Sequence, residues 1–310
     1  MCSITRTMAH SPLPPQGTPL TGFISPLLPT LVDSPPPGDK WTHEIKYDGY
    51  RTQIHVREAD VRAFTRNGHD WTDSYGPIVR SAKDLPCEAA IIDGEVIIQD
   101  ETGRSDFQGL RAAIKEAPHR LVFMAFDLLE LDGQDVRRKT LERRRELLAK
   151  LIGPNEPSNP IQFSADIPGE GMGLFMVVDD MGMEGIVSKR LDSRYVSGRS
   201  TNWLKVKCYA EQGLVVVGTE KGDAAPVALL AREEPDGSLH YMGGAMVTLR
   251  HKDRERFWRT VEALRVAEPA LEVAKRTNAT WVRPELRVRV RTLRGEDKLR
   301  HATLLGLVHT

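Results

Sequence analysis

The stretch HEIKYDGYR (43–51) offers an amine that could act as a nucleophile, because it sets Lys46 among charged neighbours. Glu44 precedes this lysine by two residues, and Asp48 and Arg51 follow it within five. Free lysine has a pKa of about 10.4, and an amine attacks only when neutral, so a nucleophilic lysine needs nearby cations to lower its pKa. Taken alone, the stretch is more typical of a surface strand that carries lysine for solubility.

Three further clusters place charged side chains within apolar runs: DGEV (93–96), EGIVSK (184–189) and WLKVK (203–207). Strand alternation in WLKVK would put Lys205 and Lys207 on one face, where they need an anion or water between them. In EGIVSK, Glu184 opens an apolar strand and Lys189 closes it. Each feature alone is weak, since a lone lysine on a strand is usually a surface residue.

The order of the clusters along the chain is more specific than any one of them. It runs Lys-x-Asp-Gly-x-x-Arg, Arg-Asn-Gly, Asp-Gly-Glu, Phe-Asp, Glu-Gly-x-x-x-Lys and Lys-x-Lys. In this order the sequence resembles the covalent nucleotidyltransferases, which include ATP-dependent DNA ligases, RNA ligases and capping enzymes. HEIKYDGYRTQIH, TRNGHDWT, AFDLLELDG, EGIVSKR and NWLKVKC are most similar to the ligase domain of bacterial non-homologous end-joining ligases, from about residue 26 to about 307.

This resemblance implies a reaction in three steps that uses ATP and Mg²⁺ or Mn²⁺. Lys46 would attack the α-phosphate of ATP, the resulting AMP would pass to a DNA 5′-phosphate, and a 3′-OH would then displace it. Glu44 and Ile45 would contact the nucleotide beside the nucleophile, and Asp48 would orient Lys46 or support the metal. Glu95 would contact the ribose or the metal, and Glu184 would bind the metal, as hard cations prefer carboxylate oxygens.

The resemblance also assigns the cations and one aromatic residue. Arg51 and Arg66 would hold the ribose or the phosphates, and later the 5′-phosphate of a nick. The lysines expected at the α-phosphate are Lys189, Lys205 and Lys207. Such cations would lower the pKa of the nucleophile and neutralise phosphate charge in the transition state. Phe126 would stack on adenine, although a core aromatic side chain fits its sequence context equally well.

The segments around these motifs predict an α+β fold, with an adenylation domain of antiparallel sheets and flanking helices. Residues 1–39 are Pro-rich, with a disordered tail expected over 1–25 and regular structure from near Trp41. Strands are predicted for RTQIHV, DVRAFTR, AAIIDGEVII, LVFMAFDLLEL, EGIVSKR and NWLKVKC. Helices are predicted for TLERRRELLAKLIG (140–153), ending at Gly153-Pro154, and for GLFMVVDDMGM. We place the adenylation domain at 26–208.

Residues 209–310 predict a second domain, a small β-barrel of the OB-fold type. Short strands are expected in GLVVVGTEKG, VALLAREEPDGSLHYMGGAMV and LRVRVRT, with turns at Asp236-Gly237 and Gly243-Gly244. One helix, DRERFWRTVEALRV, interrupts them. Several short strands and a helix within about 100 residues are typical of such a barrel.

Charge is balanced over the 310 residues but unevenly distributed. From residue 250 onward there are 15 Lys and Arg against 8 Asp and Glu, which suits a polyanionic partner. We interpret the mixed-sign RHKDRERFWR (250–259) as a solvated helix face. We expect Arg287, Arg289, Arg291 and Arg300 to contact the DNA backbone. The alternative for the three alternating arginines is an exposed edge strand protected by charge. The expected partner is nicked or broken duplex DNA.

Composition restricts the remaining classes of protein. Cys2, Cys87 and Cys208 have no metal-ligand spacing and form no disulfide framework. The sequence has no apolar run of about 18 residues and no apolar signal segment, so we expect a cytoplasmic, nucleoid-associated monomer without a membrane span. A Ku-type end-binding partner is implied only by the resemblance.

Alternative functions follow from a departure near the C-terminus. Similar proteins carry an Arg-x-Asp-Lys motif that orients the leaving pyrophosphate, whereas here LRHATLLGL (299–307) is followed by VHT. We therefore expect slow adenylylation by ATP. An RNA ligase or capping-type enzyme would share the chemistry, and a non-catalytic nick- or end-binding protein is the alternative of another class.

Overall fold

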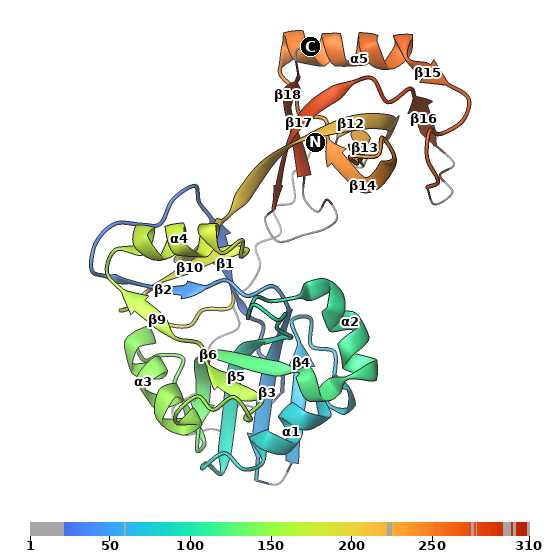
Figure 1. The fold of residues 1–310 in the computed structure, drawn as a ribbon. Helices are drawn as coiled ribbons and strands as arrows, with labels where there is room; N and C mark the ends of the chain where they lie inside the picture. Colours follow the sequence, from blue (N-terminus) through green and yellow to red (C-terminus); the bar gives the residue numbers. More distant parts are fainter. Residues whose placement is uncertain are drawn as a thin grey trace, which may run out of the picture. The chain divides into compact units, whose positions relative to one another are not determined.

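The structure, a computed structural model, describes residues 22–58, 60–221, 225–273, 276, 278–293, 299 and 302–308. Most of the predicted tail at 1–25 lies outside them. The described residues form two compact units, which Figure 1 shows as a ribbon. Unit 1 comprises 22–174 and Ile186–Val206, and unit 2 comprises Phe175–Gly185 and 207–308. No helix among the described residues is long and apolar enough to cross a membrane.

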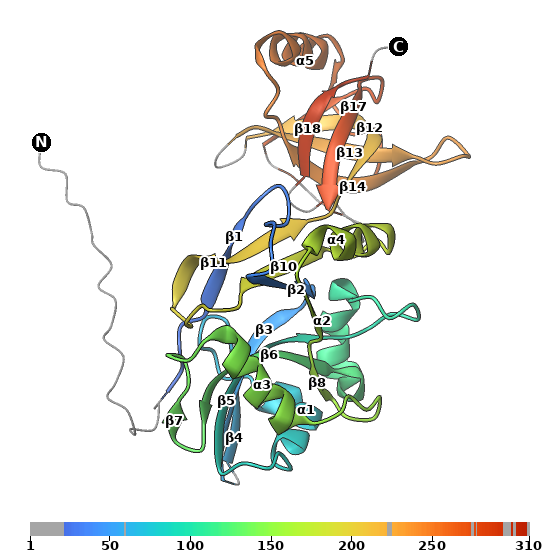
Figure 2. The same ribbon diagram turned by 90° about the vertical axis from the view of Figure 1, so that its left-hand side faces the viewer.

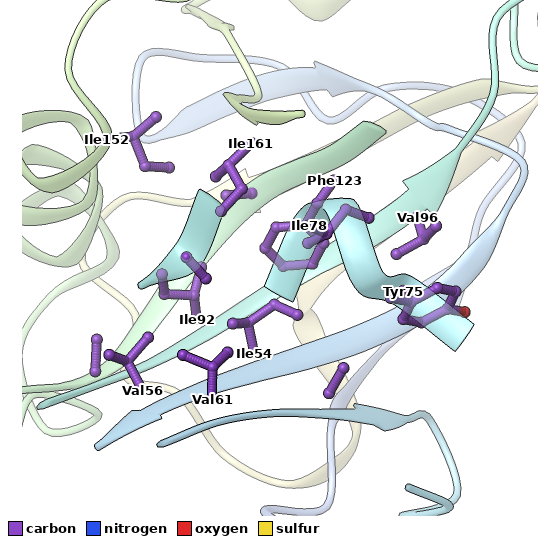
Figure 3. Close-up of a cluster of buried hydrophobic side chains, with 14 of the residues drawn as sticks. Ile54, Val56, Val61, Tyr75, Ile78, Ile92, Val96, Phe123, Ile152 and Ile161 are labelled. Atoms are coloured by element: carbon purple, nitrogen blue, oxygen red, sulfur yellow. The ribbon is translucent and has the colours of Figure 1, made fainter. Parts of the chain in front are cut away.

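A six-stranded sheet forms the larger part of unit 1. Its main path is β4-β3-β5-β6-β7, and β8 pairs in parallel with β6. The strands are β3 (Tyr50–Arg57), β4 (Asp60–Thr65), β5 (Ala89–Ile97), β6 (Val122–Leu131), β7 (Gln134–Asp135) and β8 (Ile161–Phe163). Apolar residues that alternate along β3 and β4 pack against β5, β6 and α1 in the core shown in Figure 3. The predicted strands at these positions are confirmed.

Helices complete this part of unit 1. They are η1 (Asp73–Tyr75), α1 (Gly76–Ala82), α2 (Phe107–Glu116), η2 (Pro118–Arg120) and α3 (Leu141–Ile152). The helix predicted at 140–153 is therefore confirmed, and its ends have clear causes. The Thr140 side chain accepts a hydrogen bond from the backbone N–H of Arg143, and Gly153 adopts a φ of 75°, which ends the helix. Leu148 and Ile152 join the core cluster and so bury one face of α3.

A five-stranded sheet, ordered β1-β11-β10-β2-β9, is the second layer of unit 1. The strands are β1 (Leu27–Leu31), β2 (Trp41–Ile45), β9 (Asp166–Pro168), β10 (Gly185–Arg190) and β11 (Gly198–Lys207), and α4 (Gly171–Asp180) follows β9. The expectation that regular structure starts near Trp41 is wrong, because β1 precedes it and pairs in parallel with β11. The prediction of antiparallel sheets likewise fails for β1–β11 and for β6–β8. Leu27 is fully buried, and its partners lie some 170 residues away, beyond any local pattern.

Unit 2 contains a seven-stranded sheet, five strands of which close into a barrel through the pairing of β12 with β13. Figure 2 shows the barrel strands with α5 beside them. β12 pairs with both β13 and β17, β13 pairs with β14, and β14 runs parallel to β18, which returns to β17. Its elements are β12 (Tyr209–Glu220), β13 (Val227–Glu233), β14 (Leu239–Met246), α5 (His251–Ala263), β15 (Arg265–Val266), β16 (Ala279–Val282), β17 (Arg287–Leu293) and β18 (Ala302–Leu307). A five-stranded barrel whose helix lies between the third and fourth strands confirms the predicted OB-fold.

One predicted turn in the barrel is wrong and one is correct. Gly237, with a φ of 82°, lies in the tight turn between β13 and β14. Gly243 and Gly244 instead lie inside β14, beside a register shift opposite Leu230 and Ala231. A Cβ on Gly244 would lie 2.6 Å from a side-chain carbon of Val227, so glycine here permits close approach of two strands.

Candidate active site

A cavity in unit 1 collects most of the charged motif residues, and we call it the Lys46 cavity. It encloses about 480 Å³ including its open mouth, within the range of small-molecule sites, which is roughly 300–1,000 Å³. It is lined by Pro29, Glu44, Ile45, Lys46, Tyr47, Arg51, Glu95, Phe126, Val187, Lys189 and Trp203. These residues come from both sheets of unit 1, so the cavity exists only when the two layers are assembled.

The strand pairing explains how the first motif reaches the cavity. Lys46 follows the last residue of β2, and Arg51 lies directly opposite Glu95 in the β3–β5 ladder. Gly49 connects β2 to β3, where a Cβ would lie 2.2 Å from the carbonyl oxygen of Val96. Its φ is not positive, so close packing against β5, and not a left-handed backbone conformation, requires glycine here.

Arg51 is held rigidly at the cavity wall. Its guanidinium donates to both carboxylate oxygens of Asp93, at 3.0 and 2.7 Å. Asp93 is fully buried and also accepts a 2.6 Å hydrogen bond from the Tyr195 hydroxyl. The Arg51 guanidinium lies 5.1 Å from the centre of the Phe126 ring and 5.5 Å from that of Trp203. Burial opposes the charge of Arg51, but the Asp93 carboxylate outweighs it and raises the pKa, so Arg51 supplies a permanent positive charge.

Lys189 supplies a second buried cation. Its Nζ lies 2.6 Å from Oε1 of Glu44, and 4.3 and 4.2 Å from the ring centres of Phe126 and Trp203. Burial lowers the pKa of Lys189 to about 8, against the opposing attraction of Glu44, and the nearby positive charge of Arg145 lowers it further. Lys189 is 2% exposed, so its charge acts in a poorly solvated wall.

The position of Phe126 is compatible with both roles that its sequence context left open. It is 8% exposed and belongs to a buried cluster with Leu27, Tyr195 and Trp203. It also lines the cavity, where an adenine ring could stack on it. Tyr47 lines the cavity too, and burial raises its pKa to about 12, so its hydroxyl stays protonated at neutral pH.

The cavity brings together seven of the predicted site residues: Glu44, Ile45, Lys46, Arg51, Glu95, Phe126 and Lys189. The others lie elsewhere on the chain. Asp48 lies in the loop after β2, Arg66 is exposed in the turn after β4, and Lys205 lies on β11. Glu184 and Lys207 belong to unit 2, where Lys207 Nζ lies 3.5 Å from a carboxylate oxygen of Glu184. The roles of all twelve residues, those in the cavity included, stay predictions.

The residues most relevant to a metal are carboxylates. Among the described residues, no group of three or more His, Cys, Asp or Glu side chains is arranged to hold a metal ion. Mg²⁺ does not need such a cage, since it is commonly bound by one or two carboxylates together with substrate phosphates. The Glu95 carboxylate in the cavity fits that mode of binding.

Several residues that support the cavity were missed by the sequence reasoning. Asp93 contacts the cavity residue Arg51, 42 positions away, and Arg145 contacts Glu44, 101 positions away. Tyr195 supports the cavity through Asp93, 102 positions away. Of these residues, only Arg145 on α3 could have been identified as buried from the sequence pattern. Positions 144 and 145 follow Leu141 by three and four residues, so helical periodicity puts both arginines on the buried side.

The barrel arginines alternate as predicted. Along β17, Arg287, Arg289 and Arg291 are exposed, while Val288 and Val290 are fully buried. Arg287 pairs with Glu233, Arg289 lies 3.5 Å from Glu211, and Arg291 lies over the Tyr209 ring. Their contact with DNA stays a prediction, and Arg300 lies outside the described residues.

Comparisons with known proteins agree with this geometry. The family model for the ATP dependent DNA ligase domain matches residues 33–207, and that for the ATP dependent DNA ligase C terminal region matches 222–309. The multifunctional non-homologous end joining protein LigD of Pseudomonas aeruginosa is 36% identical over 240 residues, which cover 77% of this chain and 27% of that protein. The LigD repair protein of Mycobacterium tuberculosis is 29% identical over 279 residues, which cover 86% of this chain and 36% of that protein.

A solved structure is also similar. The mycobacterial DNA ligase D complexed with ATP and MES matches with a TM-score of 0.56 at 26% identity, and the match covers 92% of this chain and 94% of that one. The chain thus spans between 27% and 36% of the length of the two LigD relatives, yet nearly all of this solved ligase structure. The two family matches and the motif residues gathered in the Lys46 cavity show that this chain belongs to the ATP-dependent DNA ligase family.

Proposed function

We propose that this chain seals nicks or breaks in duplex DNA by way of a lysyl-AMP at Lys46. The observation that carries the proposal is that Lys46 shares one cavity with Arg51, Lys189 and Glu95. Two fixed cations suit a triphosphate, and the carboxylate suits a divalent metal. The family membership and the intact lysine favour an enzyme over a non-catalytic binding protein.

The first step joins AMP to the enzyme. The neutral amine of Lys46 attacks the α-phosphorus of ATP, a P–N bond forms, and the bond to the leaving pyrophosphate breaks. Arg51 and Lys189 stabilise the negative charge of the bound phosphates and of the transferring group. Bound Mg²⁺ or Mn²⁺ would neutralise phosphate charge, with Glu95 as a ligand and Glu184 as the second carboxylate predicted from its motif.

The next two steps return the enzyme to its starting form. An oxygen of a DNA 5′-phosphate attacks the phosphorus of the lysyl-AMP, and the P–N bond breaks with Lys46 as the leaving group. The DNA 3′-OH then attacks the activated 5′-phosphorus, AMP leaves and a phosphodiester forms. Arg66 and the Lys205–Lys207 pair are proposed to contact phosphates in these steps, and Arg287, Arg289 and Arg291 to contact the DNA backbone.

The proposed cellular role is the joining of DNA breaks. The LigD relatives are named for non-homologous end joining, which supports a role in joining breaks beside a Ku-type end-binding protein. A monomer would suffice, because all the chemistry described here comes from one chain.

Intact-mass and peptide mass spectrometry after incubation with ATP and Mg²⁺ test the proposal. We expect one added AMP on Lys46, none in Lys46→Arg, and unchanged labelling in Lys115→Arg, whose lysine is exposed at the end of α2. Sealing of a DNA nick but not an RNA nick, with ATP but not GTP, would separate a DNA ligase from RNA ligases and capping enzymes. AMP on another residue, or full nick sealing by Lys46→Arg, would refute the proposal.

A further inference from the structure

Arg145 does not line the cavity, but its side chain makes four hydrogen bonds to residues that form or support the cavity wall. Its side chain is 5% exposed. One guanidinium nitrogen donates to Oε1 of Glu44 at 2.7 Å and to the carbonyl oxygen of Phe126 at 3.0 Å. The other donates to the carbonyl oxygen of Ser164 at 2.6 Å and to Oδ1 of Asp166 at 2.8 Å. One side chain therefore ties α3 to two cavity-lining residues and to β9.

The same Glu44 oxygen is shared with the cavity lysine. Lys189 Nζ lies 2.6 Å from Oε1 of Glu44, while the Ser164 hydroxyl donates to Oε2 at 3.0 Å. Two cations, Arg145 and Lys189, thus face two carboxylates, Glu44 and Asp166, and all but Asp166 are nearly fully buried. A balanced buried cluster of this kind has little freedom, because loss of one partner leaves an uncompensated charge.

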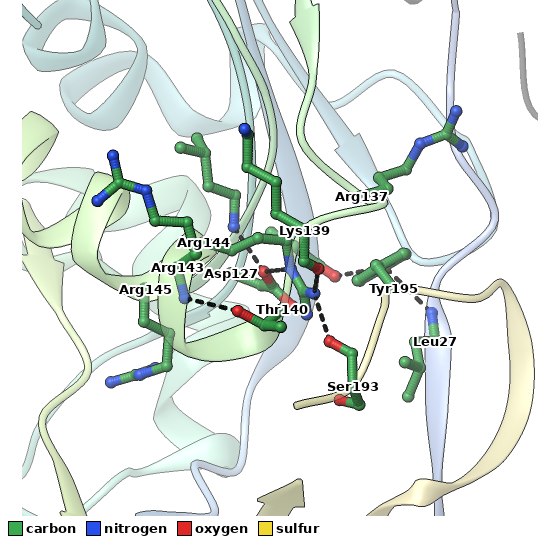
Figure 4. Close-up of polar contacts among 12 residues, drawn as sticks. Leu27, Asp127, Arg137, Lys139, Thr140, Arg143, Arg144, Arg145, Ser193 and Tyr195 are labelled. Carbon is green, nitrogen blue, oxygen red and sulfur yellow. Dashed lines mark hydrogen bonds and ion pairs between the residues drawn. The ribbon is translucent and has the colours of Figure 1, made fainter. Parts of the chain in front are cut away.

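The neighbouring arginines do not share these contacts. Arg144 is bidentate to Asp127 and donates to the carbonyl oxygens of Lys139 and Ser193. Arg143 is exposed and pairs with Glu146. Figure 4 shows the Arg144 side chain among Asp127 and Ser193, and the Arg145 side chain directed away from them. Of these three consecutive arginines, Arg145 is the one whose contacts reach the cavity wall.

We propose that Arg145 is a positioning residue for nucleotide binding, which fixes the Glu44 carboxylate and, through it, the Lys189 ammonium at the Lys46 cavity. This inference rests on the proposed function. Arg145 acts through Glu44, since its guanidinium and the Lys189 ammonium contact the same carboxylate oxygen, and Glu44 and Lys189 line the cavity whereas Arg145 does not. Groups held in this way contact ATP before and during the reaction alike, so their displacement weakens binding more than it slows the chemical step.

A double-mutant cycle on adenylylation of Lys46 tests the inference. The measured quantities are the KM for ATP and the rate at saturating ATP, for Arg145→Gln, Glu44→Gln and the double variant. Arg145→Gln should raise the KM by roughly tenfold to a hundredfold, the effect of losing one charge-assisted hydrogen bond, and should change the saturated rate much less. In the Glu44→Gln background, the same change should raise the KM by less than about threefold.

Two further variants guard against a loss of fold. Arg145→Lys keeps the charge near Glu44 but cannot make all four contacts, so it should recover part of the affinity and fold if Arg145→Gln does not. Arg137→Lys is the matched control, because Arg137 is a buried arginine paired with Asp135 outside the cavity, and its KM should equal the wild-type value.

The outcomes separate the two proposals. Additive effects of Glu44→Gln and Arg145→Gln on the KM for ATP would overturn the positioning role. A wild-type KM in both Arg145→Gln and Arg145→Lys would also overturn it, as would a rise in KM in Arg137→Lys as large as that in Arg145→Gln. Failure of the wild-type chain to take up AMP would instead refute the proposed function.

Discussion

The hydroxyl of Tyr195 should stabilise unit 1 more than any other single atom of the cavity support. It donates to the buried Asp93 carboxylate at 2.6 Å and accepts from the backbone N–H of Leu27 at 3.0 Å. The second contact is drawn in Figure 4. One oxygen thus connects β1 of the five-stranded sheet to β5 of the six-stranded sheet.

The magnitude of the Tyr195→Phe change follows from these two contacts. A hydrogen bond to a charged group contributes about 1.5–3 kcal/mol, and a buried amide left without a partner costs about 1–3 kcal/mol. Asp93 keeps its two bonds from Arg51, so the lower parts of both ranges apply. We therefore expect the free energy of unfolding to fall by about 2.5–4 kcal/mol, a large share of the roughly 5–15 kcal/mol of a typical domain.

Urea unfolding followed by tryptophan fluorescence measures the loss, because the Trp203 ring lies 6.2 Å from the Tyr195 ring. Tyr75→Phe is the matched control, since its hydroxyl is buried beside the Thr52 side chain and makes no hydrogen bond to a carboxylate among the described residues. That change should alter stability by less than about 1 kcal/mol. The reasoning is wrong if Tyr195→Phe unfolds like the wild type, or if both variants lose the same amount.

Three further predictions concern other parts of the chain. Gly94→Ala would place a Cβ 2.4 Å from the Phe123 ring, and we expect a loss of about 1–3 kcal/mol by urea unfolding, whereas Gly173→Ala, with open space around it, should lose much less. Burial lowers the pKa of His55 from 6.5 to about 4, so the unfolded chain binds a proton that the folded chain does not between these pH values. Stability should therefore fall by about 3 kcal/mol as the pH drops from 6.5 to 4, and a His55→Gln variant that shows the same fall would contradict this origin. Replacing Arg287, Arg289 and Arg291 together by Gln should reduce the slope of the logarithm of the DNA association constant against the logarithm of the salt concentration by about 2 to 3. Replacing Arg254, Arg256 and Arg259 on α5 by Gln should leave this slope unchanged. Equal slopes for both triple variants would argue against a DNA interface on β17.

The sequence predicted the parts of the site that belong to short motifs. Lys46, Arg51 and Glu95 could be identified because each sits in a short motif, and the strands carrying them alternate clearly. The OB-fold could be predicted from short strands, turns and one helix, although which strands close the barrel could not.

The missed features depend on contacts between distant segments. The Arg145–Glu44 pair spans 101 positions and the Tyr195–Asp93 pair 102, so neither leaves a local pattern. The misplaced turn at Gly243-Gly244 has a related cause. Glycine is required there by a side chain of the neighbouring strand, and the sequence alone cannot distinguish this need from that of a turn.

The parallel pairing of β1 with β11 has a consequence for protein synthesis. β1 ends at Leu31 and its partner strand begins at Gly198, so the ribosome must add about 167 residues before the pair can form. At roughly 5–20 residues per second this takes about 8 to 33 seconds. For most of that interval the nascent chain contains Lys46 but lacks Lys189, and it lacks Trp203 throughout; both residues complete the wall around Lys46. Nucleotide binding should therefore begin only after the last strand of the five-stranded sheet has emerged, which makes ATP a probe of complete synthesis of unit 1.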